Sequence, residues 1–130
     1  MNEQERKQMI GRRGDLLAEL FLQEFNPAYL ARPADDVDGI EYDYFIGFSN
    51  PRGGLNTYGV EVQATEHPVR DKYRLDRTAF EKLAFANIPS MLLVIDVKQN
   101  ELFYSWLTES ESEPNVPVTP LDEHHQMSPL

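Results

Sequence analysis

Apolar and polar residues alternate along residues 58–65, with the period of a β-strand that has one buried and one polar face. The apolar positions are Val60, Val62 and Ala64, and the polar positions are Glu61, Gln63 and Thr65. Residues 41–49 alternate in a similar way, and the stretch 50–54 between them contains a proline and two glycines, which favour a chain reversal. The pattern therefore predicts an antiparallel hairpin.

Apolar residues recur at steps of three and four along residues 4–25, which predicts a helix that ends at Asn26-Pro27. Gly11 and Gly14 each weaken a helix by about 1 kcal/mol relative to alanine. The stable part is therefore expected to begin near Gly14, after a separate turn or frayed arm. A second helix is predicted after residue 75, where Asp76 or Thr78 is the N-cap, since Thr78 and Glu81 have the spacing of a capping box.

Three further strands are predicted, over residues 29–32, 90–97 and 101–107. The continuous apolar run in 90–97 is typical of a strand covered on both faces. The order helix, three strands, helix, two strands predicts an α/β fold with a single mixed sheet flanked by helices. We assign this domain to residues 1–108. Residues 109–130 are acidic, rich in proline and serine and poor in apolar side chains, so they are expected to form a flexible tail.

The composition narrows the classes of protein that this chain can represent. With 130 residues and no cysteine, it is expected to form one domain without disulfides or thiolate metal sites. It has no apolar run of the roughly 18 residues that a membrane-spanning helix needs, so a cytoplasmic location and no membrane partner are expected. The net charge of −10 argues against a surface that attracts nucleic acid everywhere. The basic residues are nevertheless grouped, in residues 6–13 and 70–77.

An acidic run at residues 35–43 precedes the first strand of the predicted hairpin. If the strands pair, carboxylates from this run and from Glu61 converge on one side of the sheet, and Mg²⁺ is held in proteins by one or two carboxylates with water. The alternative is that Glu61 and Gln63 form the solvated face of an ordinary strand.

The segments together resemble the PD-(D/E)xK nuclease superfamily, and within it a family of small bacterial domains of unknown function. That family has a Gly-Ile-Asp segment and a later Gln/Glu-Val-Lys-Ala-Thr strand. The resemblance covers about residues 11–107 and implies a restriction-endonuclease-like fold of order α-β-β-β-α-β-β. The matching segments here are Gly14-Asp15, Gly39-Ile40-Glu41, Glu61-Val62-Gln63-Ala64-Thr65 and the stretch 87–94.

The resemblance implies hydrolysis of phosphodiester bonds assisted by Mg²⁺ or Mn²⁺. By position, Glu61 and Glu41 match the metal ligands. Asp38 is the second candidate for the upstream ligand, since a small shift of register would put it in the place of Glu41. Asp15 matches an acidic helper on the first helix, and Gln63 occupies the position of the catalytic lysine.

The glutamine at position 63 leaves two functions open, because an amide donates hydrogen bonds but carries no charge. In a metal-dependent nuclease acting on DNA or RNA, Lys82 or Lys72 is a candidate to supply the missing charge, although lysines are usually surface residues. In a pseudo-nuclease that has lost catalysis, the same fold serves as a protein-interaction module. The expected partners are accordingly a nucleic acid, another protein or a second copy of the chain.

Overall fold

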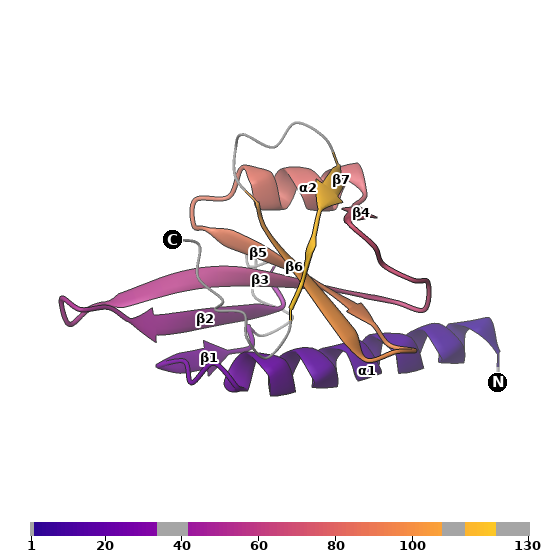
Figure 1. Ribbon diagram of the computed structural model, residues 1–130, viewed down its shortest axis with the longest axis horizontal. Helices are drawn as coiled ribbons and strands as arrows, with labels where there is room; N and C mark the ends of the chain where they lie inside the picture. Colours follow the sequence, from indigo (N-terminus) through magenta and orange to yellow (C-terminus); the bar gives the residue numbers. More distant parts are fainter. Residues whose placement is uncertain (1, 34–41, 108–113, 122–130) are drawn as a thin grey trace.

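A computed structural model of the chain describes residues 2–33, 42–107 and 114–121 (Figure 1). Within these residues the elements follow one another as α1 (Glu3–Gln23), β1 (Tyr29–Ala31), β2 (Tyr44–Ser49), β3 (Leu55–Thr65), β4 (Lys72–Arg74), α2 (Arg77–Ala84), β5 (Ser90–Asp96), β6 (Glu101–Leu107), β7 (Asn115–Pro117) and β8 (Thr119–Pro120).

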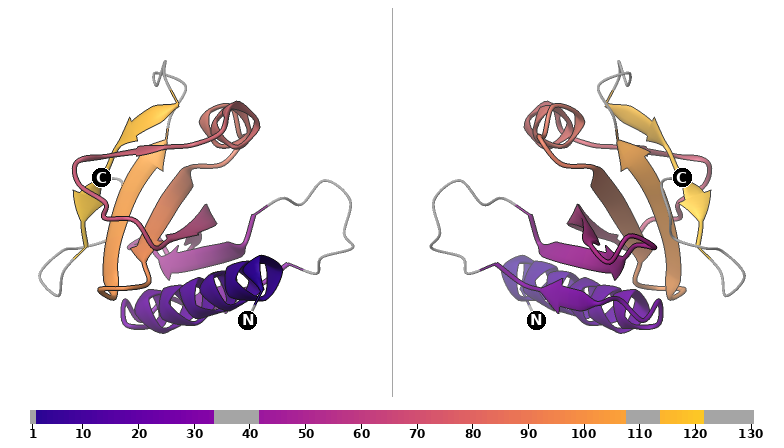
Figure 2. Two further views of the ribbon diagram at one scale, coloured as in Figure 1. Left: turned by 90° about the vertical axis from the view of Figure 1, so that its right-hand side faces the viewer. Right: turned by 90° about the vertical axis from the view of Figure 1, so that its left-hand side faces the viewer.

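The central layer is a mixed sheet of six strands in the order β1-β2-β3-β5-β6-β8. β3 and β5 are parallel and are joined through α2, whereas the other neighbouring pairs are antiparallel. Helix α1 covers one face of this sheet and α2 lies on the other face (Figures 1 and 2). The predicted α/β class and mixed sheet are therefore confirmed, as is the antiparallel hairpin of β2 and β3.

Strand β5 separates two apolar cores, because every one of its residues is buried. Met91, Leu93 and Ile95 pack in the core on the α1 side, while Leu92 and Val94 pack in the core on the α2 side. The continuous apolar run in the sequence thus corresponds to a strand covered on both faces, as predicted. Such a strand gives the neighbouring β3 a rigid support.

Helix α1 is one uninterrupted helix from Glu3 to Gln23, so the expected break or frayed arm before Gly14 is wrong. Asn2 caps its N-terminus, accepting a hydrogen bond of 2.8 Å from the backbone N–H of Glu5. Gly14 is buried where the helix crosses β3, and a Cβ added there would lie 2.6 Å from the Cβ of Ala64. The helix tolerates this glycine because it permits close packing on the sheet.

This contact predicts opposite effects for the two glycines of α1. Gly14→Ala is expected to lower the free energy of unfolding by about 1–3 kcal/mol, since the new methyl group must push the helix away from β3. Gly11→Ala is the matched control: no atom lies within 4 Å of the added Cβ, so alanine should raise stability by up to about 1 kcal/mol. Urea unfolding of both variants measures the difference, and stabilisation by both would contradict the close packing.

Helix α2 begins after Asp76, whose Oδ1 accepts a hydrogen bond of 2.7 Å from the backbone N–H of Ala79. Asp76 was one of the two predicted caps. Thr78 lies inside the helix instead, so the capping box between Thr78 and Glu81 is wrong. An aspartate cap satisfies the first N–H groups without a partner residue at the third helical position.

The chain beyond residue 113 returns to the domain, which corrects the expectation that everything after residue 108 lacks the means to pack. β7 pairs with β4 in a second, two-stranded sheet, and β8 pairs with the edge of β6. Val116, Val118 and Leu121 are buried, with exposures of 0%, 7% and 6%. Val116 and Val118 lie two residues apart and Leu121 follows three residues later, so even this polar stretch supplies apolar side chains to the core.

Candidate functional site

Strands β2 and β3 separate at Asp43, the residue before β2 begins. Their pairing ends at Tyr44 and Val60, whereas β3 continues to Thr65. The backbone N–H of Asp43 donates to the carbonyl oxygen of Val60 at 3.0 Å, and Asp43 Oδ2 accepts from the backbone N–H of Val62 at 2.7 Å. The carboxylate therefore occupies the place where the next backbone acceptor of β2 would lie.

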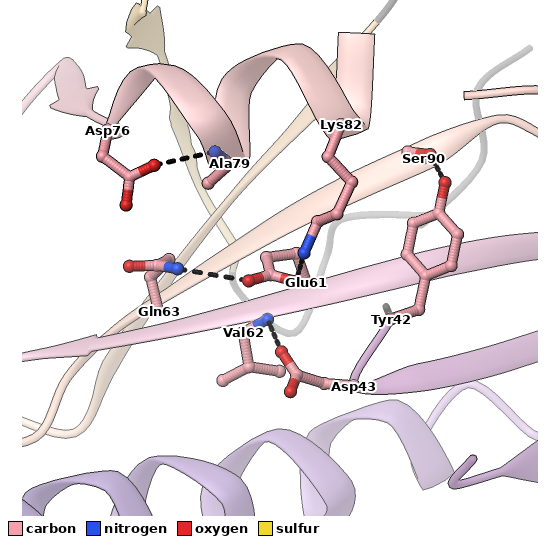
Figure 3. A network of polar contacts seen from close by, with 9 residues as sticks. All are labelled: Tyr42, Asp43, Glu61, Val62, Gln63, Asp76, Ala79, Lys82 and Ser90. Atoms are coloured by element: carbon pink, nitrogen blue, oxygen red, sulfur yellow. Dashed lines mark hydrogen bonds and ion pairs between the residues drawn. The ribbon is translucent and has the colours of Figure 1, made fainter. Parts of the chain in front are cut away.

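Tyr42 anchors the chain that leads to Asp43. Its ring lies over Gly59, where an added Cβ would come within 2.5 Å of the ring, and its hydroxyl is 2.7 Å from Ser90 Oγ on β5. Figure 3 shows the tyrosine reaching from the β2 side to β5. This contact fixes the direction from which Asp43 approaches β3.

Glu61 and Gln63 project from β3 toward α2 (Figure 3). Glu61 Oε2 accepts a hydrogen bond from Lys82 Nζ at 3.1 Å, and Gln63 Nε2 donates to Glu61 Oε1 at 3.4 Å. The hydroxyl of Tyr73, on β4, donates to Gln63 Oε1 at 3.4 Å. The polar face of β3 is consequently covered by side chains from α2 and β4, and it is not a solvated surface.

The surroundings of Glu61 and Asp43 disfavour negative charge on both. Burial raises the pKa of Glu61, and the negative charge of Asp43 raises it further, while Lys82 and the hydrogen bond from Gln63 act in the opposite direction. Burial likewise raises the pKa of Asp43; the hydrogen bond from Val62 opposes this, and the charge of Asp15 adds to it. Two carboxylates that are desolvated and close enough to repel each other are stabilised by a nearby cation.

A hollow of about 370 Å³ opens between β3 and the first turns of α2. Glu61 and Gln63 line it from β3, and Asp76, Thr78, Ala79 and Lys82 line it from α2 and its N-cap. Its volume is within the range of small-ligand sites. Glu61, Gln63 and Lys82 therefore face a space that a phosphate group and water can enter, whereas Asp43 lies beside β3 and is not among the residues that line this hollow.

The donor set suits a hard divalent cation better than a softer metal that prefers thiolate or imidazole ligands. Asp43 and Glu61 contribute carboxylate oxygens, and Mg²⁺ or Mn²⁺ accepts one or two carboxylates together with water and phosphate oxygens. Among the residues that the structure describes, no three His, Cys, Asp or Glu side chains are grouped closely enough to hold a metal by themselves. A metal here would depend on two carboxylates, and the remaining ligands would be non-protein oxygens.

The structure brings together some of the residues predicted from the sequence. Glu61 and Gln63 belong to one hydrogen-bonded cluster. Asp15 lies on α1, forms a salt bridge of 3.3 Å with Arg32, and affects the pKa of Asp43 through its charge. Glu41 and Asp38, the predicted upstream ligands, lie outside the described residues.

Lys82 and Asp43 differ in how clearly the sequence identified them as residues of the site. Lys82 was one of two candidates for the missing charge, and it contacts Glu61, whereas Lys72 is exposed on β4. Asp43 was not singled out, although it is the acid immediately before the first paired residue of β2. Its position directly before a strand of alternating polar and apolar residues is the sequence signal that could have identified Asp43.

Comparison with known proteins provides no relative for this chain. No family model, curated protein or solved structure matches it. In the described part of the chain, no helix is both long enough and apolar enough to cross a membrane.

Proposed function

We propose that this protein is a metal-dependent phosphodiester hydrolase of the PD-(D/E)xK type, with Asp43 and Glu61 as metal ligands and Lys82 as the charged residue that Gln63 does not supply. The observation that carries the proposal is the 3.1 Å contact between Lys82 and Glu61, beside a second desolvated carboxylate where two strands diverge. The order of the elements from α1 to β6, apart from the short strand β4, is also the order that the family resemblance implies. A restriction-endonuclease-like fold is part of the proposal.

Each side chain has a role that follows from its surroundings. A bound Mg²⁺ or Mn²⁺ would polarise the phosphate and lower the pKa of its water. Lys82 is held by Glu61 on the wall of the hollow, where its ammonium group faces incoming negative charge. Gln63 keeps its amide beside Glu61 and orients that carboxylate. Desolvation strengthens the interaction of Lys82 with a phosphate, since the local dielectric constant is lower than that of water.

The test is cleavage of labelled single- and double-stranded DNA and RNA with Mg²⁺, with Mn²⁺ and with chelator. Wild-type protein is expected to cleave only with metal, and Asp43→Asn and Glu61→Gln should each lower the rate about 10²-fold or more, because each amide lacks the charge that holds the metal. Both amides keep an oxygen acceptor for Val62 or Lys82. The raised pKa values of both carboxylates indicate that a neutral side chain is tolerated, so folding should be preserved.

The matched control is Glu101→Gln, which removes one exposed carboxylate from the start of β6. Its cleavage rate should equal that of the wild type. A thermal unfolding series with Mn²⁺ gives a second readout, since a metal that binds only the folded state raises the melting temperature. The proposal is wrong if the folded wild type neither cleaves any substrate nor is stabilised by metal.

An inactive protein-interaction module is the second candidate, and exposed apolar side chains favour it. Met9, Leu16 and Leu20 on α1 are exposed by 57%, 60% and 62%. Their spacing of seven and four residues places them on one side of the helix. In this alternative the contact of Glu61 with Lys82 is a structural ion pair between β3 and α2. The absence of both cleavage and metal stabilisation would favour this function.

A further inference from the structure

The free edge of β3 leads from the proposed catalytic cluster to a second part of the surface. Beyond Val60 the strand has no β2 partner, and a hollow of about 380 Å³ lies along residues 62–65, bounded by the N-terminal half of α1. Gln63 lines both this hollow and the one beside Lys82. Gln63, the residue that contacts Glu61, therefore borders both hollows at the free edge of β3.

A third hollow, also of about 380 Å³, continues the path between α1 and the turn that joins β5 to β6. Ile10 and Glu66 line it together with the second hollow, so these two spaces adjoin as well. We treat the second and third hollows as one groove beside the N-terminal half of α1, because they share Ile10 and Glu66.

The charge of this groove is opposite to that of the whole chain. Its lining contains four basic residues against two acidic ones, although the chain carries a net charge of −10. The basic residues are Arg6, Lys7, Arg13 and Lys98, and the acidic residues are Glu3 and Glu66. A local excess of positive charge on an acidic protein attracts a polyanion to that place and not to the rest of the surface.

The two arginines of the groove are held in position by the protein itself. Arg6 donates to Glu66 at 2.7 Å, and Arg13 donates to the carbonyl oxygen of Val97 at 3.0 Å and to Asn100 Oδ1. These hydrogen bonds use Nε and Nη2 of each guanidinium and do not involve Nη1. A guanidinium held in this way loses little side-chain entropy when it binds a phosphate.

The geometry points to this groove as the path of the phosphodiester backbone of a nucleic acid, which Arg6, Lys7, Arg13 and Lys98 contact on its way to the cluster of Glu61 and Lys82. The inference rests on the proposed function. It identifies the surface that binds the substrate and the direction in which the substrate extends from the site. Lys7 and Lys98 are exposed and take part in none of the salt bridges among the described residues. They are therefore the residues to change, because their replacement disturbs no contact within the fold.

The experiment measures binding of fluorescently labelled single-stranded DNA, duplex DNA and RNA in chelator, so that cleavage does not interfere. Lys7→Glu and Lys98→Glu should each weaken binding about tenfold at low salt and reduce the slope of log affinity against log salt by about 1. Arg52→Glu is the control: it makes the same change in net charge in the turn between β2 and β3, at the other end of the molecule (Figure 1). Its affinity and salt slope should equal those of the wild type. The substrate that loses most affinity in the two groove variants identifies the nucleic acid.

Equal affinities for all three variants and the wild type would overturn the groove, as would the absence of wild-type binding to any of the three nucleic acids. The same variants in the cleavage assay separate this failure from failure of the proposed function. Metal-dependent cleavage that is unaffected by Lys7→Glu and Lys98→Glu would retain the hydrolase and reject the groove. Groove-dependent binding with neither cleavage nor stabilisation by metal would reject the hydrolase and retain the groove.

Discussion

Lys82→Ala is expected to lower metal-dependent cleavage by about 10²–10³-fold, the cost of removing one donor that stabilises developing charge in a desolvated site. The physical reason is the position of the ammonium group, 3.1 Å from Glu61 on the wall of the hollow. Its side chain is only 23% exposed, so water does not replace it effectively. The measurement is the initial rate of cleavage at saturating metal.

The same substitution should also change how the rate depends on pH. Lys82 lowers the pKa of Glu61 through its charge and its hydrogen bond, and without it burial and Asp43 raise that pKa further. Because a metal ligand must be deprotonated, the acidic limb of the pH–rate profile should move to higher pH. If Glu61 formed only a structural ion pair with Lys82 and did not bind the metal, Lys82→Ala would alter stability but leave the position of this limb unchanged in any residual activity.

Three controls make the assignment of Lys82 specific. Lys82→Arg keeps the charge and should retain more activity than alanine does, and Lys72→Ala, on exposed β4, should have no effect. Gln63→Lys in the Lys82→Ala background should restore part of the rate, since it places an ammonium group on the same side of β3 (Figure 3). If Lys82→Ala cleaves as fast as the wild type, the charge required by the mechanism comes from another residue.

A chain that ends after residue 113 is expected to lose most of its stability. It lacks β7 and β8 and leaves the sites of Val116, Val118 and Leu121 unfilled. Full burial of a valine or leucine side chain is worth about 1.5–3 kcal/mol, so three of them amount to several kcal/mol. That is a large part of the roughly 5–15 kcal/mol by which a domain is stable.

Equilibrium urea unfolding measures this loss. A chain that ends after Leu121 is the matched control, because it keeps both strands and all three apolar side chains. The shorter chain should unfold at much lower urea concentration than this control. Equal unfolding midpoints for the two chains would show that β7 and β8 contribute nothing to stability. Val116→Ala, at a fully buried position, provides a single-residue check with an expected loss of about 1–3 kcal/mol.

Local sequence patterns were sufficient to predict two kinds of element: strands whose pairing partner is close in sequence, and a strand made almost entirely of apolar residues. The alternation around Val60 and the turn at residues 50–54 predicted the hairpin of β2 and β3, and the apolar run of β5 predicted a strand buried on both faces. In these segments, burial of one face or of both determines the secondary structure, and burial leaves a periodic signature in the sequence.

The sequence alone therefore determined the α/β class, the order of the main elements and the polar face of β3 that carries Glu61 and Gln63. Only the tertiary structure decided that Asp43 bonds Val62, that Lys82 meets Glu61, and that Val116 returns to the core. The first two contacts join residues that are 19 and 21 positions apart, and the pairing of β7 with β4 joins Tyr73 and Val116, which are 43 positions apart (116 − 73). No local propensity encodes them, because each contact joins segments that are distant in sequence and that only the tertiary fold brings together.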